Sequence, residues 1–103
     1  MTIDEIKRIA EISTTYDLDF PDQMDEYCNK VYEPVKKAVA DNDKTVIDFI
    51  GSCNERQQYC LATAVEDGTI EGQHPDAIAL YKKIWGKNGF RIDNRVMVST
   101  IAV

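Results

Sequence analysis

Apolar side chains recur at every third or fourth residue along most of the chain, and this spacing constrains the fold more than any other feature. It gathers side chains on one face of an α-helix, whereas a strand requires strict alternation. The first such stripe consists of Ile3, Ile6, Ile9 and Ile12. Thr2 and Glu5 fit a capping box ahead of it, so we expect a helix over about residues 3–14.

The second stripe is longer and contains a proline. Its members are Met24, Tyr27, Cys28, Val31, Val35, Ala38 and Val39. They predict a helix over about residues 21–41, with Pro21 in its first turn. Pro34 removes one helical hydrogen bond inside this segment. We expect a kink there and not a break, because the stripe continues in phase on both sides.

A third helix is expected after Asp43, which is a suitable N-cap residue. Its apolar face consists of Val46, Phe49, Ile50, Cys53, Gln57, Cys60, Leu61 and Ala64. Gly51 weakens this helix without breaking it. Residues 66–68 are predicted to end it, with Gly68 in a left-handed conformation, and residues 70–73 to form a loop.

The last third of the chain predicts a fourth helix and a tail that fits two alternatives. His74-Pro75-Asp76 opens the helix, and residues 86–89 end it. The tail, residues 90–103, is rich in β-branched side chains, so it is either a final helix or an edge strand that pairs with a partner or a second copy. We favour the helix because no other segment alternates like a strand. The expected fold is all-α: one domain over residues 1–103, built as a bundle of four to five helices.

Residues that support catalysis are sparse. His74 is the only histidine, and it stands at a helix start, where it caps the helix or is solvated. The three cysteines, Cys28, Cys53 and Cys60, lack the C-x-x-C spacing of zinc sites and fall on the apolar stripes. The glycines do not cluster as a phosphate-binding loop requires. We therefore expect a protein that is not an enzyme, with no metal and no cofactor.

The charge distribution is more informative than the motifs. The chain carries 18 acidic and 12 basic residues, a net charge of -6. Nucleic acids and anionic membrane surfaces select the opposite sign, so neither is an expected partner. The odd number of cysteines, and a charged N-terminal segment unlike an export signal, favour a cytoplasmic protein. The expected partner is a basic protein, and the oligomeric state is left open.

The excess of acidic residues is concentrated early in the chain. No basic residue lies between Ile9 and Asn29, and helical spacing places acidic side chains opposite the second apolar stripe. Aromatic residues interleaved with these acids are typical of binding anchors. The predicted partner-binding residues are Tyr16, Asp17, Asp19, Asp22, Asp25, Glu26 and Glu33. The simpler alternative is a solvated face that prevents self-association.

In size, acidity and helical pattern, the whole chain resembles small acidic bacterial immunity proteins that neutralise a cognate toxin, including those of contact-dependent growth inhibition. The resemblance is one of overall character, and no functional residue is carried over from it. It implies an inhibitor whose carboxylates occupy the substrate groove of a basic toxin or nuclease domain. Two alternatives stay open: a phage-type inhibitor of a nucleic-acid enzyme, and a small-molecule-binding helical domain with a pocket around His74, Tyr81 and Trp85.

Overall fold

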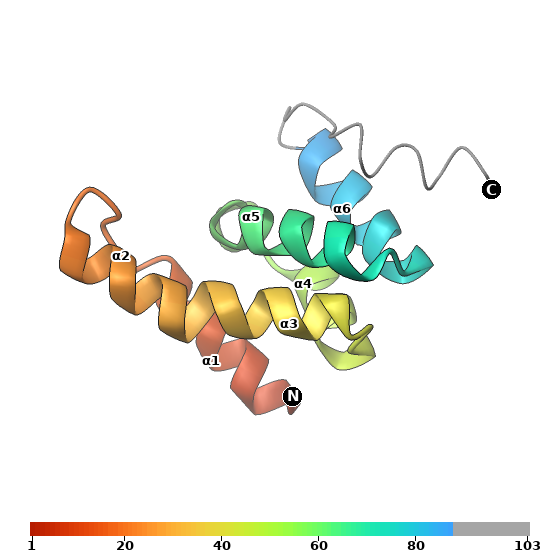
Figure 1. The fold of residues 1–103 in the computed structure, drawn as a ribbon, viewed down its shortest axis with the longest axis horizontal. Coiled ribbons are helices and arrows are strands. Elements are labelled where there is room, and N and C mark those ends of the chain that lie inside the picture. The colour runs from red at the N-terminus through yellow and green to blue at the C-terminus, as the bar shows by residue number, and fades with distance from the viewer. Residues whose placement is uncertain (88–103) are drawn as a thin grey trace.

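The computed structural model describes residues 1–87, and every regular element in this range is a helix, which confirms the all-α prediction. The elements are α1 (Ile3–Ser13), α2 (Pro21–Tyr27), the π-helical segment η1 (Cys28–Tyr32), α3 (Glu33–Ala40), α4 (Lys44–Ser52), α5 (Glu55–Gly72) and α6 (Pro75–Lys87). α2, η1 and α3 follow one another without interruption and form one long rod (Figure 1). The predicted tail, residues 90–103, lies outside the described residues. No helix within residues 1–87 is both long enough and apolar enough to span a membrane.

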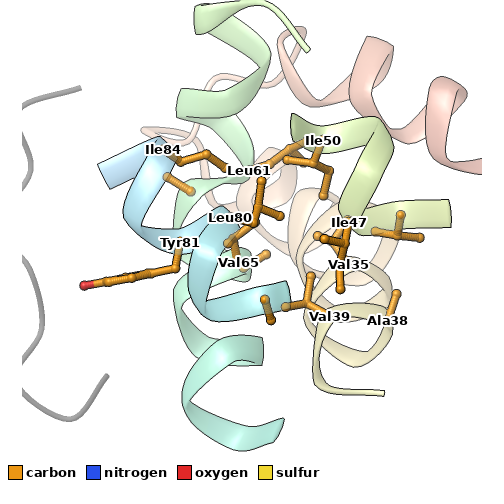
Figure 2. Close-up of a cluster of buried hydrophobic side chains, with 14 of the residues drawn as sticks. Val35, Ala38, Val39, Ile47, Ile50, Leu61, Val65, Leu80, Tyr81 and Ile84 are labelled. Carbon is orange, nitrogen blue, oxygen red and sulfur yellow. The ribbon is translucent and has the colours of Figure 1, made fainter. Parts of the chain in front are cut away.

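α5 is the central helix of the bundle. It packs against α3 on one side and α6 on another, and α1 also contacts it. Figure 2 shows side chains from four helices converging on the core: Val35, Ala38 and Val39 of α3, Ile47 and Ile50 of α4, Leu61 and Val65 of α5, and Leu80 and Ile84 of α6. Val35, Ala38, Val39, Ile50 and Leu61 belong to the predicted apolar stripes, whereas Ile47 and Val65 lie outside them. Burial of these side chains holds the bundle together.

Pro34 is accommodated by the π-helical segment that precedes it, and the rod does not break. Tyr27, Val31 and Val35 are all buried, at intervals of four residues. In a regular α-helix Tyr27 and Val35 would point about 80° apart. The wider π turn restores a common direction for all three side chains. The irregularity expected at Pro34 is thus a local rotation of the rod just before the proline.

The predicted third helix is two helices in the structure. α4 ends at Ser52, and Asn54 begins α5 with a capping box. The Asn54 side chain accepts a hydrogen bond from the Gln57 N–H (2.9 Å), and the Gln57 side chain accepts one from the Asn54 N–H (3.4 Å). This local signal outweighs the continuity of the apolar stripe. Asp43 caps α4 as expected, by accepting a hydrogen bond from the Val46 N–H (3.4 Å).

α5 also continues beyond its predicted end. Gly68 lies inside the helix, and the left-handed residue that follows α5 is Gln73, with a φ of 53°. The prediction that residues 66–68 end the helix and residues 70–73 form a loop is therefore wrong. A glycine near the end of an apolar stripe was interpreted as a C-cap, whereas it serves close packing.

Gly68 and Gly72 form what we call the glycine seam between α5 and α3. A Cβ atom on Gly68 would lie 2.6 Å from the carbonyl oxygen of Lys36, and one on Gly72 would lie 2.3 Å from that of Ala40. Both distances are shorter than van der Waals contact allows. The absence of side chains at these two positions therefore lets the α5 and α3 backbones approach each other.

Candidate functional site

Most of the predicted partner-binding residues lie at one end of the molecule, where the loop of residues 14–20 leads into α2 (Figure 1, orange). Five exposed acidic residues of this segment form what we call the acidic end: Asp17, Asp19, Asp22, Asp25 and Glu26. Pro21 occupies the first turn of α2, where its missing N–H costs no hydrogen bond.

Asp17 organises the loop. Its side chain accepts a hydrogen bond from the Asp19 N–H (3.1 Å), and its carbonyl oxygen accepts one from the Phe20 N–H (3.2 Å). The Asp17 N–H in turn donates to the side-chain oxygen of Gln23 in α2 (2.7 Å). The loop of residues 14–20, which we call the acidic loop, is therefore held to the first turns of α2 by hydrogen bonds. These bonds fix the backbone that carries its carboxylates.

Three carboxylates of the acidic end, those of Asp19, Asp22 and Asp25, have no basic side chain within 4.0 Å among residues 1–87. Glu26 differs, because Lys30 one turn later donates to its carboxylate (2.7 Å). The negative charge of this end is thus neutralised at only one of its α2 positions. Such a surface attracts a cationic partner over a distance set by ionic strength.

Glu33 is separated from the other predicted residues. It begins α3, beyond the π turn that rotates the rod, and its carboxylate lies 3.5 Å from the Lys36 ammonium. Lys36 also lies 3.9 Å from Glu71 of α5. Glu33 therefore belongs to a mixed-charge surface over α3 and α5. Regular helical spacing predicts Glu33 on the same face as Asp22 and Glu26, but it does not include the π turn of η1.

Large apolar side chains are exposed beside the acidic residues. Phe20 is 57% exposed, and Leu18 and Met24 are exposed to a lesser degree. Met24 was predicted to face the core, but the core begins one turn later, at Tyr27. Exposed apolar groups rimmed by polar ones are typical of protein–protein interfaces.

An aromatic hollow of about 420 Å³ lies between the acidic loop and helices α2, α5 and α6. Within residues 1–87, it is lined by Ser13, Tyr16, Leu18, Tyr27, Tyr59, Cys60, Ala62, Thr63 and Trp85. Tyr16 meets Tyr27 edge to face, with ring centroids 6.0 Å apart, so a predicted site residue forms part of the wall. The hollow is in the size range of small-ligand pockets.

Of the three residues expected around one pocket, the structure brings Tyr81 and Trp85 together but does not place His74 at the aromatic hollow. Tyr81 is fully buried and stacks on Trp85 with centroids 5.5 Å apart. His74 is not among the residues that line the hollow. Trp85 instead faces residues of the acidic loop and α5, and its indole N–H donates to the Ala62 carbonyl oxygen (3.2 Å).

The cysteines are half-buried thiols without disulfide partners. Burial raises the pKa of the Cys53 and Cys60 thiols, so these side chains are protonated at neutral pH. A protonated thiol is a poor nucleophile and a poor metal ligand. Within residues 1–87, no group of three or more histidine, cysteine or acidic side chains is arranged to hold a metal ion.

Leu18, Met24 and Tyr59 were not predicted as site residues, and Trp85 was expected only in a pocket with His74 and Tyr81. Leu18 stands between two aspartates in a loop, and an apolar residue in that setting was a signal available in the sequence. The places of Met24, Tyr59 and Trp85 depend on which helices pack together, and spacing along the sequence does not show this. Comparison of the chain with protein families, with curated proteins and with solved structures found no match.

Proposed function

We propose that this protein is an inhibitor that binds a basic protein, a toxin or nuclease domain, through its acidic end. In this role it is a small immunity protein of the kind that neutralises a cognate toxin. The observation that carries the proposal is one of placement: unpaired carboxylates and exposed apolar side chains occupy the same end of the molecule. Carboxylates steer a cationic partner, and apolar groups supply contact once it has docked.

The proposed mechanism needs no chemistry from the inhibitor. A nuclease or similar enzyme holds substrate phosphates in a positively charged groove. Negative charge is presented by Asp19, Asp22 and Asp25, on a backbone that the hydrogen bonds of Asp17 hold in place. These carboxylates can therefore occupy the groove in place of phosphate. Inhibition is then competitive with substrate and weakens as salt screens the charges. The reduced thiols are in keeping with a protein that works in the cytoplasm.

Affinity capture tests the proposal. The tagged protein is incubated with lysate and with any neighbouring gene product, and the complex is washed at low and high salt. We expect one basic protein to be retained at low salt and released as salt rises. Reversal of Asp22, Asp25 and Glu26 to lysine should lower its affinity by about tenfold or more, because steering and contact are both lost.

The matched control reverses the same number of carboxylates elsewhere, at Asp4, Asp41 and Asp48, all exposed in the structure. This variant changes the net charge by the same amount and should bind within about threefold of the parent. Equal loss in both triple variants would reduce the proposal to a general charge effect. Unchanged affinity with Asp22, Asp25 and Glu26 reversed would overturn it.

The aromatic hollow supports a second candidate, a small-molecule-binding domain. A metabolite that raises the melting temperature of the parent, and loses this effect when Tyr59 is replaced by leucine, would favour that candidate. A phage-type inhibitor of a nucleic-acid enzyme shares the first mechanism with a different target, and the identity of the captured protein separates the two.

A further inference from the structure

The chemistry of the aromatic hollow is selective. Of the nine lining residues in the described part of the chain, four carry aromatic rings and none carries a formal charge. Five of them carry a hydroxyl group: Ser13, Tyr16, Tyr27, Tyr59 and Thr63. The hollow therefore combines ring faces, which attract cations, with hydroxyl oxygens, which accept hydrogen bonds.

Several donors of the hollow are already directed at backbone carbonyl groups. The Ser13 hydroxyl donates to the Ala10 carbonyl oxygen (2.7 Å), and the Tyr27 hydroxyl donates to that of Cys60. The Trp85 indole N–H donates to Ala62. The two hydroxyl oxygens keep lone pairs that can accept, so the hollow suits a guest that brings donors of its own.

The charge around the hollow favours a cationic guest. In the sequence, Asp17 stands between two lining residues, Tyr16 and Leu18, and Asp19 comes directly after Leu18. Among residues 1–87, Arg56 donates to the Thr14 carbonyl oxygen (3.2 Å) and Lys30 pairs with Glu26, so both have partners. Arg8 lies on the other side of Tyr16, where it lines a neighbouring hollow with Lys30. A guanidinium group fits these conditions best, since it is planar, always charged, carries five N–H donors and stacks on aromatic faces.

We propose that the aromatic hollow receives an arginine side chain of the basic partner. This inference rests on the proposed function and adds a specific anchor to it: the carboxylates of the acidic end steer the partner, and the hollow holds one guanidinium group. Lysine is a poorer guest, because its compact ammonium does not stack on a ring.

Trp85 provides a direct test, because it is the only tryptophan of the chain and it lines the hollow. The probe is a hexa-arginine peptide amide, compared with hexa-lysine at equal ionic strength. Total binding is measured by the anisotropy of a labelled peptide, and occupation of the hollow by Trp85 emission with the unlabelled peptide. We expect hexa-arginine to change the emission saturably and hexa-lysine to change it much less.

Tyr59→Leu removes one ring of the hollow, and Tyr59 is 62% exposed, so the fold should tolerate the change. We expect it to weaken hexa-arginine binding about two- to fivefold and to reduce the Trp85 response. Thr63→Val, which removes one acceptor, serves as a second variant. The matched control is Ile3→Ser, which changes an exposed apolar residue outside both the hollow and the acidic end and should leave the Trp85 response unchanged.

The outcomes separate this inference from the proposed function. If hexa-arginine binds by anisotropy without changing Trp85 emission, or if Tyr59→Leu behaves like Ile3→Ser, the hollow is not the anchor, and the acidic end alone binds the peptide. If the peptide does not bind at all at low salt, the arginine anchor is overturned, and the capture experiment decides the proposed function independently.

Discussion

The glycine seam and the acidic end differ in how closely their helices are packed. At the seam, Gly68 and Gly72 have no side chains, and the backbones of α5 and α3 approach until a single added carbon would collide. At the acidic end, Phe20 and Met24 are large apolar residues that the fold leaves exposed. Burial of apolar surface is the main favourable contribution to folding, so the first region specifies the fold and the second contributes little to it.

This contrast also explains why the two regions differ in their tolerance of change. A substitution in a closely packed interface forces backbone or side-chain shifts, whereas an exposed residue away from caps and ion pairs rarely changes stability. A protein that binds through one end needs a rigid body behind it, and the seam joins two of the longest helical stretches into such a body.

The largest expected effect comes from filling the seam. Gly72→Ala would place a Cβ 2.3 Å from the Ala40 carbonyl oxygen, and backbone atoms there cannot move without displacing α3. We expect a loss of about 3 kcal/mol or more in the free energy of unfolding, and a similar loss for Gly68→Ala. Urea denaturation measures both variants.

Gly51→Ala is the control for helix propensity. Its Cβ would lie 3.8 Å from Leu80, an ordinary contact, and alanine is the better helix former. We expect stability to be unchanged or raised by up to about 1 kcal/mol. If Gly68→Ala and Gly72→Ala proved as mild as Gly51→Ala, the close approach of α3 and α5 would be wrong.

An intermediate effect is expected from the two tyrosines that join the long rod to α5. Tyr32 donates to the Asp67 carboxylate, and Tyr27 donates to the Cys60 carbonyl oxygen. Tyr32→Phe should cost about 1–2 kcal/mol at pH 8, since it leaves a carboxylate without its donor. Urea denaturation of the parent and of Tyr32→Phe measures this loss.

The same tyrosines predict how stability changes in alkali. Burial raises the pKa of Tyr27 to about 12, and the hydrogen bond to Asp67 is the main cause of the raised pKa of Tyr32. Unfolded tyrosine loses its proton near pH 10. Between pH 10 and about 12 the unfolded chain therefore binds fewer protons than the folded one, and stability falls as pH rises.

The Tyr27→Phe, Tyr32→Phe double variant isolates this contribution. It should start less stable than the parent at pH 8 but lose less stability between pH 8 and pH 11. Lysines whose pKa is raised by ion pairs, such as Lys37 and Lys44, contribute a loss of the same sign in both proteins, so the difference between the two proteins is what matters. An identical decline would show that neither tyrosine is protected by the fold.

The sequence predicted the elements that depend on local spacing, and it failed where distant segments meet. Stripes of apolar residues located the helices, and the cap at Asp43 was correctly placed. The seam was missed because Gly68 has the same local signature whether it ends a helix or packs against another one. The Asn54-x-x-Gln57 capping box was in the sequence but was outweighed by the stripe that runs across it.

The candidate site was predictable in its charges and not in its shape. Runs of acidic residues are visible in any sequence, so Asp17, Asp19, Asp22, Asp25 and Glu26 could be named in advance. The rotation introduced by a π turn depends on how the rod packs, and it removes Glu33 from this group. The aromatic hollow is built from helix ends far apart in the chain, which spacing along one helix does not bring together.

The smallest effect on stability is expected for the exposed apolar residues of the acidic end, where substitutions should mainly change binding of the partner. Phe20 is the N-cap residue of α2 and makes no side-chain capping bond, so Phe20→Ser supplies a hydroxyl where helices favour one. The Phe20→Ser, Met24→Ser double variant should change the free energy of unfolding by less than about 1 kcal/mol. If these side chains are contact residues for the basic partner, its affinity should fall by about tenfold.

Ile3→Ser is the matched control for that variant, because Ile3 is an exposed apolar residue and is the first residue of α1. The N-terminal end of α1 lies away from α2 and the loop before it (Figure 1). It should affect neither unfolding nor capture of the partner to a comparable degree. Equal binding by the double variant and by Ile3→Ser would mean that the apolar residues beside the carboxylates are exposed without being used, and that attraction at this end is electrostatic alone. A large loss of stability in the double variant would instead assign Phe20 and Met24 to the fold, and the distinction between a region that folds the chain and a region that binds would no longer hold.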